Sequence, residues 1–214
     1  YATGYNTSTG AHNVSVGHNS LYSNTTASQN TALGACSLYA NTTGSNNIAV
    51  GYQALKANTC GGCNVAMGNL TMAANTTGAG NTALGRAAMN ENTTGACNVG
   101  VGYGALESNT SANLNVAVGR DALTTNTTGC SNTATGSCAL VDNTTGCRNE
   151  AVGAFALQSN TTGGCNSAIG YNSLGTNTTG INNIAVGYNA LVNSTTANYN
   201  VAVGACAGYA NTTG

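Results

Sequence analysis

Glycine recurs every 17 residues along this chain of 214 residues, and this spacing constrains the fold more than any other feature. The series runs from Gly17 to Gly204 and contains twelve glycines with no insertion or deletion between them. We number the positions of each repeat as slots counted from this anchor glycine. A strict period of this length is typical of repeat proteins, in which one unit is too small to bury a core and is stabilised by its neighbours.

The repeat pattern predicts strands and excludes helices. The consensus is G-x-x-A-L-x-x-N-T-T-G-x-x-N-x-A-V. Two fixed glycines and an Asn-Thr-Thr-Gly turn leave no room for ten helical residues. Two short strands, at slots −4 to −1 and +1 to +5, fit between Gly and Asn corners. We therefore predict an all-β chain, a parallel β-solenoid of about 12 coils that forms a single domain over residues 1–214.

Equal slots of successive coils should stack into files. The invariant Asn at slot −4 predicts an amide ladder, and Leu or Met at slot +4 predicts an apolar file. Glycine at slots 0 and +10 suits corners that need positive φ or close backbone approach. Alternation places slots −4 and −2 on one face and slots −3 and −1 on the other. If the small Ala at slot −2 points inward, the Val and Leu file at slot −1 points outward and marks a partner surface. A corner that breaks the alternation would instead put slot −1 in the core, and the sequence leaves both arrangements open.

Two segments carry a resemblance to a known family. Residues 47–55 and 183–191 read NIAVGYQAL and NIAVGYNAL. They resemble the head repeats of YadA-type trimeric autotransporter adhesins, and also repeats of viral tail fibres. The resemblance covers essentially the whole chain, although the 17-residue unit is longer than the usual head repeat. It implies a left-handed parallel β-roll, extracellular display and often a trimer.

Asn-x-Ser/Thr motifs recur once per coil and predict N-glycosylation. At slot +7 they occur at Asn24, Asn41, Asn75, Asn92, Asn109, Asn126, Asn143, Asn160, Asn177 and Asn211, and one slot earlier at Asn6 and Asn193. Asn13 and Asn69 are two further matches elsewhere in the coil. The alternative is that Asn-Thr-Thr-Gly is only turn chemistry. We favour a ladder of glycans on one corner, because the two shifted motifs still keep an acceptor.

The slots of the nine cysteines indicate which of them can form disulfides with one another. Cys130 and Cys147 share slot +11 in adjacent coils, and a strand spacing of about 4.8 Å is compatible with a disulfide. Cys165 lies one coil and one slot further and competes for Cys147. Cys60 and Cys63 are close enough in sequence to pair locally. Three others share slot +2 but lie four or more coils apart, so that they are buried thiols or bridges between subunits: Cys36, Cys138 and Cys206. Disulfides together with glycosylation motifs indicate a secreted, extracellular setting.

Composition argues against catalysis, nucleic-acid binding and membrane insertion. Only 4% of residues are charged, the net charge is −1, and no run of 18 apolar residues occurs. The two histidines lie in the first coil, the acidic residues are scattered over different slots, and no unit breaks the repeat to build a pocket. We expect no enzyme activity, no cofactor and no metal.

The ends of the chain suggest how copies assemble. Slot +4 is Gly4 in the first coil and Gly208 in the last, followed by Tyr5 and Tyr209. Open solenoid edges polymerise, so we expect a head-to-tail homopolymer, with lateral association or a trimer as further forms. A segment cut from a longer array is the alternative. The leading interpretation is a structural glycoprotein of an extracellular filament or surface appendage. An adhesin or viral tail-fibre module is the second, and an ice-binding protein, suggested by the Thr rows, the third.

Overall fold

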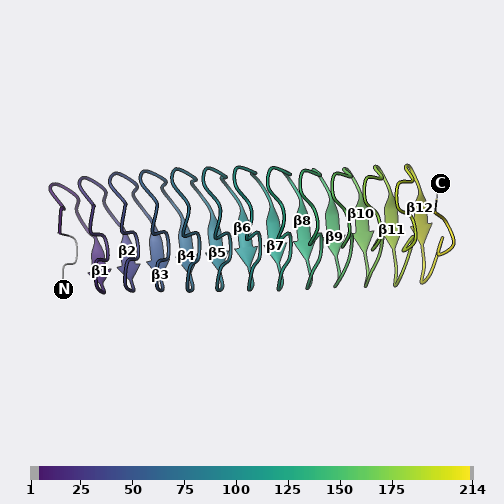
Figure 1. Cartoon of the computed structure of the whole chain (residues 1–214), viewed down its shortest axis with the longest axis horizontal. Helices are drawn as coiled ribbons and strands as arrows, with labels where there is room; N and C mark the ends of the chain where they lie inside the picture. Colours follow the sequence, from purple (N-terminus) through teal and green to yellow (C-terminus); the bar gives the residue numbers. More distant parts are fainter. Residues whose placement is uncertain (1–4, 213–214) are drawn as a thin grey trace. The chain divides into compact units, whose positions relative to one another are not determined.

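The computed structural model describes residues 5–212 of the chain. The chain divides into two compact units, Tyr1–Ser111 and Ala112–Gly214, which are described separately. Unit 1 contains β1 (Val14–Val16), β2 (Thr31–Leu33), β3 (Ile48–Val50), β4 (Val65–Met67), β5 (Thr82–Leu84) and β6 (Val99–Val101). Unit 2 contains β7 (Val116–Val118), β8 (Thr133–Thr135), β9 (Glu150–Val152), β10 (Ser167–Ile169), β11 (Ile184–Val186) and β12 (Val201–Val203). Residues 5–212 contain no helix, and within each unit the strands stack in chain order (Figure 1).

The predicted parallel β-solenoid is confirmed in both units. Within each unit, neighbouring strands pair in parallel at an offset of 17 residues, as in Ala32↔Ala49 of unit 1 and Ala168↔Ala185 of unit 2. Equal slots of successive coils therefore lie side by side. The fixed glycine spacing sets this register, because a slip by one residue would turn every inward side chain outward.

Each coil has one strand, not the two that the repeat pattern predicted. The strand covers slots −3 to −1, while slots +1 to +5 form turns. The reason is that slots +2 and +4 take positive φ, as in Cys36 (58°) and Leu38 (49°). This segment still bonds to both neighbouring coils: the Cys36 N–H donates to the His18 carbonyl at 2.9 Å, and the Leu38 N–H donates to the Ala54 carbonyl at 3.0 Å.

The core is narrow and is built from three inward, mainly apolar files, at slots −2, +3 and +4; the alanines at slot +3, such as Ala54 and Ala156, are fully buried. Alanine at slot −2 is fully buried along most of both units, and so is the Leu or Met at slot +4. The slot +4 residues have φ values such as 51° at Leu55 and 50° at Leu157. A left-handed backbone is an outlier above all for β-branched side chains. This explains why slot +4 holds Leu and Met but never Val or Ile.

Space restricts both glycine slots, and the anchor slot is restricted by its backbone conformation as well. The anchor glycines have φ near that of Gly51, 133°, which L side chains rarely adopt. At slot +10 the restriction is space in the coils that hold glycine: a Cβ on Gly61 would clash with the Gly78 carbonyl and lie 2.6 Å from the Asn58 Oδ1 atom. Three coils accommodate alanine at this slot, at Ala27, Ala112 and Ala197. Coils can therefore approach each other closely at this corner.

Candidate functional site

The asparagine file at slot +7 is buried and forms a ladder of amide hydrogen bonds. In unit 1 the Asn58 Nδ2 donates to the Asn41 Oδ1 of the preceding coil at 2.9 Å, and the Asn75 Nδ2 donates to the Asn58 Oδ1 at 2.8 Å. In unit 2 the Asn143 Nδ2 donates to the Asn126 Oδ1 at 2.8 Å. Asparagines at this slot from Asn24 to Asn177 have no exposed surface. The file is therefore a structural element of each unit.

This burial conflicts with the prediction of N-glycans at slot +7. A glycan is attached to Nδ2, which here has no access to solvent and already donates two hydrogen bonds. The conflict covers Asn24, Asn41, Asn75, Asn92, Asn109, Asn126, Asn143, Asn160 and Asn177. The Asn-Thr-Thr sequence is both a glycosylation motif and the segment that contains the buried ladder. The motif alone therefore did not distinguish a glycosylated asparagine from a buried structural one.

The remaining predicted acceptors differ in accessibility. Asn6 and Asn69 have exposed side chains. Asn13, Asn193 and Asn211 are half-buried, and their Nδ2 atoms donate to the Ala27 carbonyl at 2.8 Å, the Tyr209 carbonyl at 2.8 Å and the Asn200 Oδ1 at 3.2 Å respectively. Accessible acceptors among the predicted set are therefore Asn6 and Asn69.

The predicted ladder at slot −4 is present, but its bonds differ from those at slot +7. The Asn64 N–H donates to the Asn47 Oδ1 at 3.0 Å, so each side chain caps the backbone of the next coil. The Asn64 Nδ2 donates to the Gly78 carbonyl at 2.9 Å, and the Asn75 Nδ2 donates to the same carbonyl at 3.0 Å. The two asparagine files thus converge on one slot +10 carbonyl in each coil.

The two threonine rows are not equivalent. Hydroxyls at slot +8 are used within the fold: Thr42 Oγ1 donates to the Thr59 carbonyl at 3.0 Å, and Thr144 Oγ1 to the Thr161 carbonyl at 3.0 Å. Side chains at slot +9, such as Thr43 and Thr145, are exposed. One exposed row remains, which falls short of the flat two-row face that an ice-binding protein would present.

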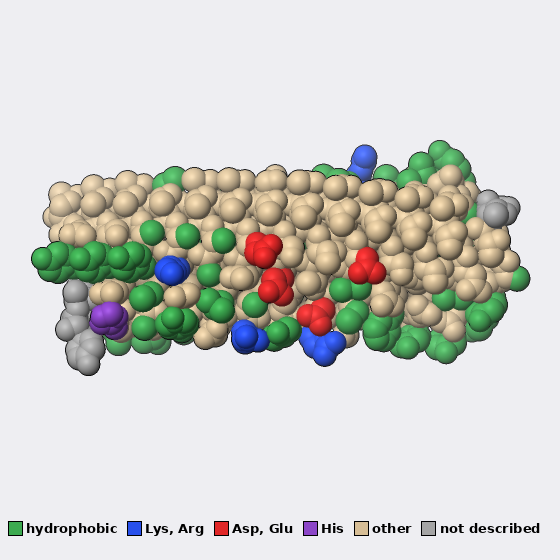
Figure 2. Space-filling model, viewed as in Figure 1, with side chains coloured by type: hydrophobic (Ala, Val, Ile, Leu, Met, Phe, Trp, Pro, Cys, Tyr) green, Lys and Arg blue, Asp and Glu red, His purple; other side chains and the backbone are tan. Residues whose placement is uncertain are grey.

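The strand face that the sequence left ambiguous points outward. In unit 1 the slot −1 side chains Leu33 and Met67 are 46% and 44% exposed, and the slot −3 side chain of Ile48 is 41% exposed. In unit 2, Ile169 at slot −1 and Ile184 at slot −3 are also exposed. Charged side chains are few among the uncharged surface in view (Figure 2). Each unit therefore presents an outward strand face, which we call the outward face (slots −3 and −1). Slot −1 is apolar except for Thr135, whereas slot −3 alternates between apolar residues and Thr31, Thr82, Thr133, Glu150 and Ser167.

Aromatic rings at the surface form short stacks. Tyr5, Tyr22 and Tyr39 at slot +5 stack with successive ring centroids 5.4 Å apart. In unit 2, Tyr171 stacks on Tyr188 at 5.6 Å. Of the residues predicted at the assembly ends, Tyr5, Gly208 and Tyr209 are exposed, while Gly4 lies outside the described residues. Gly208 has φ 65° and replaces the buried leucine of the preceding coils.

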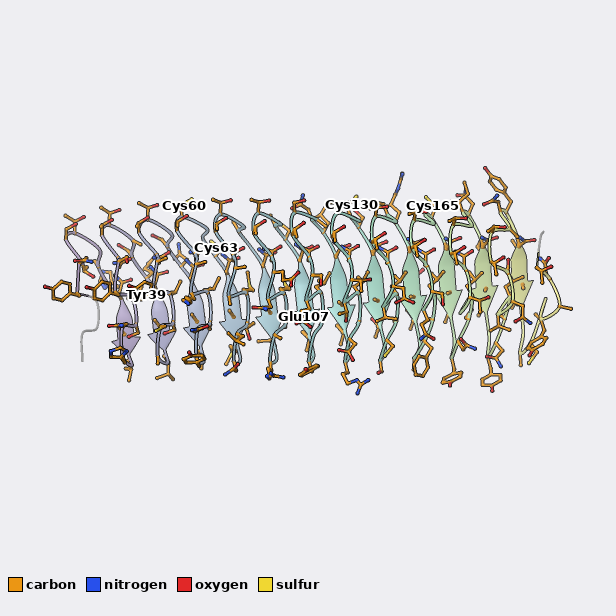
Figure 3. All side chains as sticks on the ribbon, in the orientation of Figure 1. Tyr39, Cys60, Cys63, Glu107, Cys130 and Cys165 are labelled. Atoms are coloured by element: carbon orange, nitrogen blue, oxygen red, sulfur yellow. The ribbon has the colours of Figure 1, made fainter. Side chains whose placement is uncertain are left out.

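The structure brings Cys130 and Cys147 together as the sequence predicted. Their Sγ atoms are 3.0 Å apart, and both are free thiols. The hydrogen bond to Cys147, together with burial, raises the pKa of the Cys130 thiol above its ordinary value. Cys130 and Cys165 lie on the same edge of unit 2 (Figure 3).

The other cysteines are also free thiols. Cys60 and Cys63 are exposed, and their local pairing stays a prediction. The slot +2 cysteines are half-buried or exposed, so the expectation that they are buried thiols is wrong: Cys36, Cys138 and Cys206. Slot +2 lies in a surface turn with positive φ, which keeps these side chains out of the core.

His12 and His18 are exposed, and Arg120 pairs with its neighbour Asp121 at 3.1 Å. Within residues 5–212, no group of three or more His, Cys, Asp or Glu side chains is placed to hold a metal ion. The same part of the chain has no helix that could cross a membrane. No family model, curated protein or solved structure matches this chain.

Proposed function

We propose that this chain is a structural subunit of an extracellular filament or surface appendage, assembled from copies of itself. The observation that carries the proposal is the outward face. Monomeric proteins rarely expose a contiguous apolar surface of this kind, and such surfaces mark sites of association. The β-solenoid provides the regular scaffold on which the face is displayed.

The regular spacing of the outward face favours a second copy of the same chain as the partner. Side chains on it repeat at the strand spacing of about 4.8 Å. An identical face repeats at the same interval, so its side chains can interdigitate along many coils, as in stacked sheets. A helix advances about 5.4 Å per turn and would lose register within a few coils. Glu150 at slot −3 is the one acidic residue in this file and limits close packing only locally.

End-to-end stacking of copies is the second contact that we propose. A terminal strand of a parallel stack leaves backbone groups that another strand can pair with. Tyr209 occupies the same slot as the stacked Tyr5 and Tyr22, so a joint between two copies would extend this aromatic stack. A heterologous contact that does not close on itself produces an open fibre. Any N-glycans are proposed to sit on Asn6 and Asn69, whose side chains are exposed.

The lateral contact is tested by placing charges on the outward face. The wild-type protein should be oligomeric in sedimentation velocity at micromolar concentration, and Leu33→Lys with Met67→Lys should be monomeric. Lysine at the exposed slot +9, in Thr43→Lys with Thr77→Lys, is the matched control and should leave the oligomer intact. A wild-type protein that remains a folded monomer at high concentration would rule the proposal out.

An adhesin or tail-fibre module is the second candidate. The exposed stacked rings of Tyr171 and Tyr188 favour it, because aromatic side chains at a surface are typical of recognition sites. Binding to a panel of glycans and cell-surface proteins that is abolished by Tyr188→Ser, with the oligomeric state unchanged, would support this function.

A further inference from the structure

We propose that Cys147 and Cys130 form a thiol–disulfide exchange site for small anionic disulfides, in which Cys147 is the attacking sulfur and Cys130 the resolving one. The inference does not depend on the proposed filament. It rests on an asymmetry between two thiols that share slot +11 of adjacent coils in unit 2.

Hydrogen bonding distinguishes the two sulfur atoms. Cys147 Sγ accepts the backbone N–H of Cys130 at 3.0 Å and the Cys130 S–H at 3.0 Å. Both donors are directed at the Cys147 sulfur, so that Cys130 is the proton donor of the pair. The thiolate is the nucleophile in exchange. The Cys147 thiol itself is directed only at the Thr145 carbonyl, at a long 3.6 Å. The same contact holds the proton on Cys130, whose pKa is raised by its hydrogen bond to Cys147.

Both thiols are half-buried, but only Cys147 borders a surface notch. A surface notch of about 350 Å³ is lined by Cys147 and Cys165 but not by Cys130. The slot +11 file reads Cys130, Cys147, Gly164 and Ile181, so the coil that follows Cys147 has no side chain to cover it. A reagent that enters the notch therefore reaches Cys147. Cys130 belongs to the preceding coil and lies on the side of Cys147 that faces away from Gly164.

The notch favours a disulfide that carries negative charge. Arg148 lines it and is exposed, and within residues 5–212 its guanidinium makes no ion pair. Thr145, Thr162 and Asn182 add polar groups to the lining, and Ile181 adds an apolar wall. A guanidinium recognises carboxylates well, so a peptide-like disulfide with free carboxylates, such as oxidised glutathione, suits the site.

The exchange proceeds in two balanced steps. The Cys147 thiolate attacks one sulfur of the external disulfide, forms a mixed disulfide and releases one small thiolate. The Cys130 thiol then loses its proton to solvent and attacks Cys147 Sγ, which forms the Cys130–Cys147 bond and releases the second thiolate. The external disulfide is reduced to two thiols, and the pair of protein thiols is oxidised to one disulfide.

The test follows the order of the steps with oxidised glutathione, by alkylation and peptide mass spectrometry of the reduced full chain. The wild type should form the Cys130–Cys147 bond. Cys130→Ser should accumulate glutathione on Cys147, whereas Cys147→Ser should leave Cys130 largely unmodified. A wild-type Cys147–Cys165 bond, or equally fast modification of Cys130 in Cys147→Ser, would overturn the assignment of roles.

Two further variants test the notch. Gly164→Val places at slot +11 a side chain like that of Ile181 and should slow modification of Cys147 at least tenfold, with unchanged circular dichroism. Arg148→Gln should slow the reaction with oxidised glutathione about fivefold, as expected for one exposed ion pair, but not the reaction with a neutral hydroxyethyl disulfide. Equal rates for Gly164→Val and wild type would exclude the notch as the route, and equal slowing with both reagents would exclude charge recognition.

Discussion

Removing one amide from the slot +7 ladder should destabilise unit 2 far more than an exposed change in the same turn. The Asn143 Nδ2 donates to the Asn126 Oδ1 at 2.8 Å and to the Gly146 carbonyl at 3.0 Å, and the Asn143 Oδ1 accepts from the Asn160 Nδ2 at 2.8 Å. Asn143→Ala removes these three buried bonds, each worth about 1 kcal/mol. The expected loss is about 3 kcal/mol, a large fraction of the 5–15 kcal/mol that stabilises a typical domain.

The measurement is the free energy of unfolding in guanidinium chloride, followed by circular dichroism. Thr145→Ala, at an exposed position two residues further on, is the matched control and should change stability by less than about 0.5 kcal/mol. If Asn143→Ala were no more destabilised than this control, the ladder would not stabilise the fold. The recurrence of asparagine at this slot would then need another explanation, and N-glycosylation would again be the favoured one. Mass spectrometry of the native protein tests that interpretation directly, because the buried ladder predicts unmodified Asn143.

Three further predictions follow from the same files. Leu140→Ile should cost more than the roughly 1.5 kcal/mol of a volume-conserving core swap, because Leu140 has φ 53° and isoleucine is β-branched. Denaturant unfolding checks this, and a cost below that value would contradict it. Ser194→Asn should raise stability by about 1 kcal/mol, since Asn177 Oδ1 and Ser194 Oγ are buried without partners and an amide there would complete the ladder; an unchanged melting temperature would contradict it. Oxidation of Cys130 and Cys147 should stabilise the protein by about 3 kcal/mol for a loop of this length, visible as a higher melting temperature that reducing agent reverses, whereas an unchanged temperature would show that the bond does not constrain the unfolded chain.

The period and the register could be predicted from the sequence because glycine is needed at a fixed place in each coil. The anchor glycines take φ values near 130°, which other residues avoid, so they mark the coil unambiguously. The second strand could not be predicted correctly. Leucine at slot +4 suggests an ordinary strand, and nothing in its propensity indicates the left-handed backbone seen at Leu38. Stacking against neighbouring coils overrides that local preference.

The candidate sites were predictable to different degrees. The pairing of Cys130 with Cys147 follows from equal slots in adjacent coils. The burial of the slot +7 asparagines was missed, although the sequence contains one signal for it. Slot +7 is still asparagine at Asn58, where the sequence is Asn-Thr-Cys and not a good glycosylation motif. A residue kept for a glycan has no reason to persist there, whereas a rung of a ladder does. The direction of the outward face depended on the corner at slot 0, whose geometry the sequence does not specify.

The paired amide files have a consequence for how such a gene can change in length. One inserted or deleted residue would shift every later side chain out of its column and leave buried amides facing the wrong partners. Gain or loss of a complete coil would preserve all of these contacts, because each coil meets only its two neighbours. The protein can therefore grow or shrink in whole turns, while smaller changes are expected to be confined to substitutions.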